Sequence, residues 1–254
     1  MQSGGMGGSG GEAGGGPVSS PKSRLTAHPI GMPYAKNGFW EYLPPHYDDG
    51  AKRPLLLFMH GSGENGAGTA GTELNKVLRH GPAKLINTNV WTADRPFIVL
   101  SMQHSGAVTQ CPTAAEVHEF LTFGIANYHV DPSKVYMTGL SCGGHGGFAY
   151  LGQYKGEQVA AAVLIAADCN PAYNAAGCSL LDTVGLWTVH GANDGPAQDQ
   201  AGMAKFLACP QPRKDAKWNL IPGANHQQTW EAVYDDPTFM NNVVTWFLGQ
   251  SKGQ

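Results

Sequence analysis

Short apolar runs alternate with longer amphipathic stretches along most of the chain. Six apolar runs have the length and composition of strands, at 54–59, 97–100, 135–138, 163–165, 186–189 and 218–221. Stretches with apolar residues at helical spacing lie between or after them, at 72–79, 113–128, 142–154, 197–208 and 238–248. Because repeated strand–helix–strand units build a parallel sheet, the pattern predicts an α/β fold, with a mostly parallel twisted sheet and helices on both faces.

Two local signals refine this prediction. Thr113 with Glu116 three residues later forms a capping box, which predicts that a helix begins there. The segment 26–43, which ends in the apolar run Phe39–Leu43, precedes the first parallel strand. We expect it to add one or two antiparallel strands at the beginning of the sheet.

The first 23 residues differ in composition from the rest. They are rich in Gly and Ser and contain no aromatic residue, so they cannot bury a core. We expect residues 1–23 to form a flexible tether and residues 24–254 to form one domain. Such a tether resembles the spacer between a bacterial lipoprotein anchor and its secreted domain, which predicts a secreted or cell-surface location. The alternative is a simple disordered or engineered terminus.

Charge and hydropathy exclude two classes of function. Only 14% of the residues are charged and the net charge is −3, with no run of Lys and Arg, so nucleic acid is not an expected partner. No apolar run reaches the length of a membrane span.

The chain has five cysteines, Cys111, Cys142, Cys169, Cys178 and Cys209. An odd count leaves at least one cysteine outside any disulfide, and two disulfides among the five could form in about 15 ways. Cys169 and Cys178 are close in sequence and are the pair we expect first. No Cys/His spacing typical of zinc occurs, so we predict no metal site.

The sequence Gly139-Leu140-Ser141-Cys142-Gly143 fits the G-x-S-x-G pattern of a nucleophilic serine on a sharp strand-to-helix turn. In a chain with 35 glycines, chance supplies about 0.2 such matches, and residues 7–11 also fit. Only Ser141 has an apolar strand before it and a helix after it. We therefore predict that Ser141 is a nucleophile.

A serine nucleophile needs a base and an acid that orients the base. In α/β-hydrolases these follow in the order Ser, Asp or Glu, His. Asp194 follows the run 186–189, and His226 follows the run 218–221. This order predicts Asp194 as the acid and His226 as the base. Asp168 remains an alternative acid, and His190 is expected to bond to backbone at the end of its strand.

Acyl transfer also needs N–H groups that stabilise an oxyanion. One is expected from Cys142, directly after the nucleophile, and the second from Ser62 in the loop 60–66, His-Gly-Ser-Gly-Glu-Asn-Gly. This loop has the glycine content of a phosphate-binding loop but matches neither G-x-x-x-x-G-K-[ST] nor G-x-G-x-x-G. The sequence therefore predicts no cofactor.

These motifs, HGSGENG, GLSCGGHG, HGANDG and GANH, together resemble the polyhydroxybutyrate-depolymerase and feruloyl-esterase-like branch of the α/β-hydrolases, over residues 36–248. The resemblance implies a secreted serine carboxylic-ester hydrolase that acts through an acyl-enzyme on plant polysaccharide esters (feruloyl or acetyl) or on aliphatic polyesters. It departs from this branch at position 142, where Met is frequent, and a disulfide there would stiffen the turn. The substrate pocket is expected to include Glu64, Cys111, His145 and Trp230.

Three alternatives stay open. Trp230 has the spacing of a residue that packs a helix against the core as well as that of a pocket residue. Some members of the same branch are described only as predicted peptidases, so a serine peptidase is the second candidate function. A non-catalytic binding protein on a hydrolase fold is the third.

Overall fold

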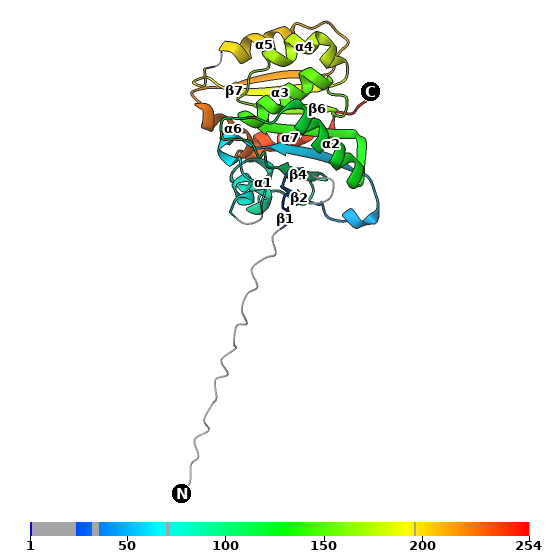
Figure 1. Cartoon of the computed structure of the whole chain (residues 1–254), viewed down its shortest axis with the longest axis vertical. Coiled ribbons are helices and arrows are strands. Elements are labelled where there is room, and N and C mark those ends of the chain that lie inside the picture. Colours follow the sequence, from blue (N-terminus) through cyan, green and yellow to red (C-terminus); the bar gives the residue numbers. More distant parts are fainter. Residues whose placement is uncertain (2–23, 32–35, 70–71, 196, 254) are drawn as a thin grey trace.

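The computed structural model describes residues 24–31, 36–69, 72–195 and 197–253, together with the first residue (Figure 1). The expected tether at 1–23 lies outside the described residues, apart from that first residue. Within the described part, no helix is long and apolar enough to cross a membrane.

Eight strands of the described residues form one sheet, in the order β1-β2-β4-β3-β5-β6-β7-β8 (Figure 1). They are β1 (Thr26–His28), β2 (Phe39–Tyr42), β3 (Arg53–Met59), β4 (Ile98–Met102), β5 (Val130–Leu140), β6 (Ala161–Ile165), β7 (Gly185–Gly191) and β8 (Ala216–Ile221). The six strands from β3 to β8 are parallel, and β1 and β2 pair antiparallel at one edge. The predicted α/β class and the antiparallel start of the sheet are both confirmed.

The helices are α1 (Gly81–Asn87), α2 (Ala114–Asn127), α3 (Cys142–Tyr154), α4 (Asn170–Ala176), α5 (Ala197–Leu207), α6 (His226–Tyr234) and α7 (Pro237–Leu248). The capping box at the start of α2 is present, with the Thr113 N–H donating to Glu116 Oε2 at 2.8 Å. The helix expected at 72–79 differs from the structure, where a 3₁₀ helix (Leu74–Arg79) leads into α1. Further 3₁₀ turns span Tyr47–Asp49, Ser62–Glu64 and Gly177–Asp182.

Both faces of the sheet are buried, as the continuous apolar runs require. Along β3 the side chains alternate, with Leu55 and Leu57 in one core cluster and Leu56 and Phe58 in the other. The first cluster includes apolar residues of α2, α3, α4 and α5, and the second those of α1, α6 and α7. Because helices cover both faces, polar chemistry is confined to the ends of the strands.

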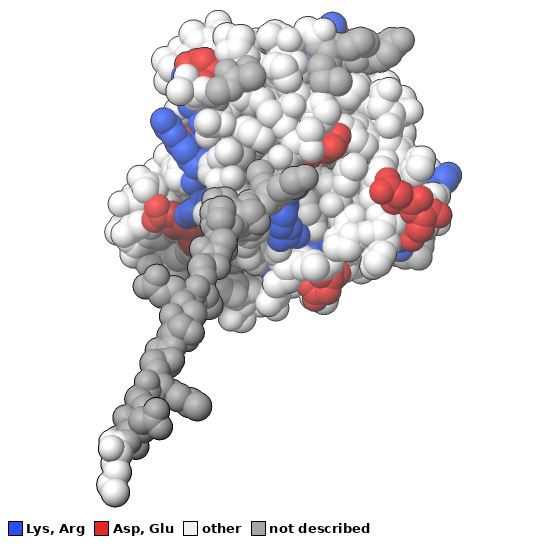
Figure 2. All heavy atoms as spheres, turned by 90° about the horizontal axis from the view of Figure 1, so that it is seen from below, with Lys and Arg blue, Asp and Glu red and all other residues white. Residues whose placement is uncertain are grey.

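Charged residues are sparse on the surface. Figure 2 shows one face of the molecule on which small groups of basic and acidic residues are separated by wide uncharged areas. The small number of charged residues on this face agrees with the low charged fraction of the sequence.

The structure corrects the expected disulfide pairing. Cys111 is bonded to Cys142, and Cys178 to Cys209, while Cys169 is a buried thiol. Cys169 precedes α4 with its sulfur against α5, where a Cβ added to Gly202 would meet it at 2.5 Å. Its neighbour in sequence, Cys178, lies beyond α4 and reaches the segment after α5 instead. Closeness in sequence was therefore a wrong guide, because α4 separates the two thiols.

Candidate active site

Ser141 occupies a sharp turn between β5 and α3. Its backbone has φ 51° and ψ −116°, a conformation with positive φ that residues with side chains rarely adopt. The Ser141 N–H donates to the carbonyl of Ile165 on the neighbouring strand β6 at 2.8 Å, which holds the turn in place. Strain of this kind persists only where the surroundings enforce it, and it is concentrated at functional sites.

The two glycines that flank this turn are required by close packing. A Cβ on Gly139 would lie 2.7 Å from the carbonyl carbon of Gly143, and a Cβ on Gly143 would lie 2.2 Å from the carbonyl oxygen of Met59. Real Cβ atoms do not approach neighbours closer than 3.0 Å. The G-x-S-x-G pattern therefore reflects the contact between the turn, the start of α3 and the end of β3.

Ser141, His226 and Asp194 form a continuous hydrogen-bonded chain. Ser141 Oγ lies 2.8 Å from His226 Nε2, and His226 Nδ1 lies 2.7 Å and 2.8 Å from the two carboxylate oxygens of Asp194. Because a carboxylate only accepts, the proton of the ring is on Nδ1 and is donated to Asp194. Nε2 is then left to accept the proton of the Ser141 hydroxyl. The imidazole side chain is 49% exposed, whereas that of Asp194 is 13% exposed.

Local hydrogen bonds fix the two loops that carry these residues. His226 is the first residue of α6, and its predecessor Asn225 caps that helix by accepting from the Gln228 N–H at 3.0 Å. Asn193 Nδ2 donates to the carbonyl of Gly223 at 3.0 Å and joins the loops after β7 and β8. These bonds hold the carboxylate and the imidazole in register.

The two side chains that were weighed against these assignments have other partners. His190 Nε2 bonds to the carbonyl of Asp194 at 2.9 Å, as expected for a strand-end residue that supports the loop. Asp168 Oδ1 accepts from the backbone N–H and the side-chain amide of Asn170, at 2.9 and 2.8 Å, at the start of α4. The acid that contacts His226 is Asp194.

The loop after β3 lies directly against the serine turn. A Cβ on Gly61 would meet Leu140 Cδ1 at 2.7 Å and Ser141 Cβ at 3.8 Å. Ser62, the expected second oxyanion donor, is the next residue and begins the 3₁₀ turn Ser62–Glu64. Cys142 is the first residue of α3, where N–H groups have no partner within their own helix.

His60 fixes the shape of this loop. The buried imidazole accepts the His104 N–H at Nε2 at 2.9 Å, so its proton is on Nδ1, which donates to the carbonyl of Gly61 at 2.6 Å. Burial lowers the pKa of His60 to about 4, and the ring is neutral at physiological pH. Sequence reasoning assigned no role to His60, although its place at the end of β3 was visible.

Glu64 is a buried carboxyl beside the same loop. It is 5% exposed, and its Oε2 has no hydrogen-bond partner among the described residues. Oε1 lies 3.8 Å from His80 Nε2, and a Cβ on Gly61 would meet Oε2 at 3.3 Å. Burial raises the pKa of Glu64 to about 7, so the carboxyl is partly protonated near neutral pH.

Trp230 lies between the imidazole of the hydrogen-bonded chain and His80, the neighbour of Glu64. Its ring lies edge-on to His226 with centroids 4.9 Å apart, and edge-on to His80 at 5.8 Å. The side chain belongs to a core cluster, which is the packing role considered for Trp230, and its pocket role stays a prediction. Its Nε1 is buried and has no hydrogen-bond partner among the described residues. His80 was missed because only the tertiary fold brings it here.

The remaining expected pocket residues lie on the side of α3. His145 is exposed, and its N–H donates to the carbonyl of Ser141 at 2.9 Å. Cys111, which is disulfide-bonded to Cys142, borders a hollow of about 410 Å³. Its other lining residues are His104, Ser105, Gly106, Gln110, Thr113 and Glu116. Among the residues that the structure describes, no cluster of His, Cys, Asp or Glu suits a metal ion.

No family model and no curated protein matches the chain. Solved structures do match it. One is a thermostable esterase, with a TM-score of 0.65 and 17% identity over 90% of this chain and 64% of the esterase. This chain therefore spans less than two thirds of that esterase. The chain has the α/β-hydrolase fold.

Two further structures show how widely this α/β-hydrolase fold is used. The feruloyl esterase module from Clostridium thermocellum, in complex with sinapinate, has a TM-score of 0.61 and 17% identity, over 85% of this chain and 90% of the module. Dipeptidyl peptidase 4 from Porphyromonas gingivalis has a TM-score of 0.59 and 13% identity, over 89% of this chain and 35% of the peptidase. At these identities the likeness concerns the fold, and the chemistry has to be argued from the site.

Proposed function

We propose that the chain is a serine carboxylic-ester hydrolase that acts through an acyl-enzyme on Ser141. The observation that carries the proposal is the hydrogen-bonded chain from Ser141 Oγ through His226 to Asp194, at 2.8 and 2.7 Å, which starts from a strained turn. A serine hydroxyl is a weak nucleophile unless a base accepts its proton, and this arrangement supplies that base and its orienting acid.

The reaction follows from the positions of these groups. As Ser141 Oγ attacks the ester carbonyl, His226 Nε2 takes its proton, and Asp194 stabilises the imidazolium that results. The oxyanion accepts hydrogen bonds from the backbone N–H groups of Cys142 and Ser62. His226 then gives the proton to the departing alcohol. In the second half, His226 activates a water molecule, which releases the acid and restores Ser141.

The substrate that we propose is an ester of a plant polysaccharide, feruloyl or acetyl, or an aliphatic polyester. The motif resemblance supports this class, as does the similar fold of a feruloyl esterase module.

We also propose that the protein works outside the cytosol, at the cell surface or secreted. Two disulfides in one domain support this location, because thiols in the cytosol are kept reduced.

The test is hydrolysis of p-nitrophenyl acetate and butyrate by the wild type, Ser141→Ala and Ser179→Ala. Ser179 is an exposed control that lies before β7, at the opposite end of this strand from Asp194. We expect Ser141→Ala to lose activity by at least about 10³-fold and Ser179→Ala to keep it. Full activity in Ser141→Ala would overturn the mechanism.

A substrate panel then separates the classes. Methyl ferulate, acetylated xylan and polyester film test the acyl and alcohol groups. A p-nitroanilide compared with the matching p-nitrophenyl ester tests the peptidase alternative, which the peptidases of the same fold keep open. Faster cleavage of the amide than of the ester would exclude the esterase proposal.

A further inference from the structure

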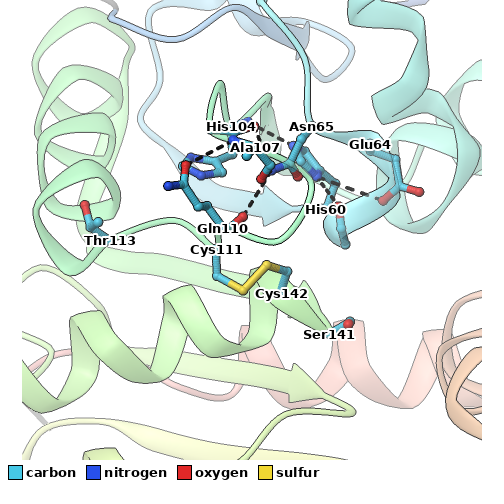
Figure 3. Close-up of a disulfide and its surroundings, with 12 residues drawn as sticks. His60, Glu64, Asn65, His104, Ala107, Gln110, Cys111, Thr113, Ser141 and Cys142 are labelled. Carbon is cyan, nitrogen blue, oxygen red and sulfur yellow. Dashed lines mark hydrogen bonds and ion pairs between the residues drawn. A yellow bond between two sulfur atoms is a disulfide. The ribbon is translucent and has the colours of Figure 1, made fainter.

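A disulfide attaches the serine turn to a loop on another strand. Cys142 directly follows Ser141, and it is bonded to Cys111 in the loop 103–113, which leaves β4 (Figure 3). The disulfide thus fixes the residue whose N–H is proposed to donate a hydrogen bond to the oxyanion. Its partner loop contains no member of the proposed triad.

Asn65 ties the same loop to the other half of the proposed oxyanion hole. This buried residue lies three positions after Ser62. Its Nδ2 is 2.8 Å from the carbonyl of Ala107, 3.0 Å from that of Gln110 and 3.2 Å from that of Gly106. Figure 3 shows Asn65 and the disulfide on opposite sides of this loop. The loop therefore folds around a side chain from the segment that carries Ser62.

His60 adds a second link at the root of the loop, because its Nε2 accepts the N–H of His104 at 2.9 Å. The loop after β4 is thus attached to two other segments. Hydrogen bonds from Asn65 and His60 join it to the segment after β3, and the disulfide joins it to the start of α3.

We infer that Asn65 and the Cys111–Cys142 disulfide are positioning residues that hold the N–H groups of Ser62 and Cys142 at a fixed separation. This inference rests on the proposed function. The two donors lie on different elements, and an oxyanion hole is effective because its donors are oriented before the charge develops. The loop 103–113, which contains no member of the proposed triad, links the two segments that carry these donors.

The second disulfide is a matched control. Cys178–Cys209 spans 31 residues, the same sequence separation as Cys111–Cys142, so each bond constrains the unfolded chain to a similar degree. It joins the segment before β7 to the segment after α5, away from Ser141. Removal of either bond should lower stability alike, and only the first should affect catalysis.

The experiment measures kcat and KM for p-nitrophenyl butyrate in three variants, at a temperature where circular dichroism shows each to be folded. The variants are Cys111→Ala/Cys142→Ala, Cys178→Ala/Cys209→Ala and Asn65→Ala. Loss of one oxyanion donor costs about 10²–10³-fold in kcat, and a displaced donor costs less. We expect the first and third variants to lose at least about tenfold in kcat with KM unchanged within about twofold, because the oxyanion exists only in the transition state. The second variant should keep the wild-type kcat.

A wild-type kcat in both Cys111→Ala/Cys142→Ala and Asn65→Ala would overturn the inference. If the first of these does not fold, Asn65→Ala decides, since it keeps both disulfides. An equal loss of kcat in Cys178→Ala/Cys209→Ala would also overturn it, because the effect would then follow from stability. Ser141→Ala, measured beside them, separates the two proposals: activity that survives this substitution refutes the serine mechanism itself.

Discussion

Replacing Gly143 with alanine adds one methyl group at the point where α3 meets the end of β3. The new Cβ would lie 2.2 Å from the carbonyl oxygen of Met59 and 2.6 Å from that of His60. Both obstacles are backbone atoms, so no side-chain rotation can relieve the clash. Either the start of α3 or the end of β3 must move by roughly 1 Å to reach an ordinary contact.

This movement separates the two elements that carry the oxyanion donors. Forcing an extra methyl group into a packed site costs about 1–3 kcal/mol, which corresponds to a lower Tm by about 2–4 °C for each kcal/mol in a domain of this size. A misplacement of about 1 Å at a catalytic centre can cost about 100-fold in rate. We therefore expect Gly143→Ala to remain folded at 25 °C and to lose one to two orders of magnitude in kcat.

The assay combines thermal unfolding with kcat for p-nitrophenyl butyrate. Gly63→Ala is the matched control, because a Cβ on this glycine of the adjacent loop meets no heavy atom within 4 Å. It should keep both its Tm and its kcat. A Gly143→Ala enzyme with the wild-type Tm and kcat would show that the contact between α3 and β3 does not set the geometry of the site.

Three further predictions concern the surroundings of the serine turn. Burial raises the pKa of Glu64 from 4.5 to about 7, so the folded state binds the carboxyl proton more tightly than the unfolded chain does. This proton binding stabilises the fold fully below about pH 4.5, and the stabilisation, on the order of 3 kcal/mol, is lost as the pH rises through 7. Glutamine does not titrate, so the Tm of Glu64→Gln minus that of the wild type should be larger at pH 8 than at pH 5. The same Tm difference at both pH values would contradict the burial argument. His60→Phe leaves the His104 N–H without its acceptor, so it should lower the free energy of unfolding in urea by about 1–3 kcal/mol and should also lower kcat. An unchanged urea midpoint would show that the hydrogen bond at 2.9 Å is dispensable. Thr113→Ala removes the cap that accepts from the Glu116 N–H and should cost about 1 kcal/mol with kcat unchanged; a large loss of kcat would mean that this end of α2 takes part in the site.

The sequence alone predicted the parts of the fold that depend on local patterns. The apolar runs located the parallel strands, because a strand buried on both faces must be apolar throughout, as 54–59 is. The Thr113 capping box located the start of α2 for a similarly local reason. The short helices α1, α4 and α6 were not among the predicted helices, since they contain too few turns to show an apolar period.

Features that depend on tertiary contacts were harder to predict. The order rule placed Asp194 and His226 in sequence, and the structure brings both to Ser141. The order rule alone does not reveal the links formed by Asn65 and Cys111, because their contacts join segments about 40 residues or 31 residues apart. The expected Cys169 pairing failed for the same reason.

Covalent labelling of the nucleophile tests the central claim most directly. A fluorophosphonate phosphonylates a serine that a neighbouring base activates, with loss of fluoride, and mass spectrometry of the peptides then identifies the residue. We predict one label per chain, on Ser141, and no label in His226→Ala under the same conditions. A label on another residue, or equal labelling of Ser141 without the His226 imidazole, would contradict the account.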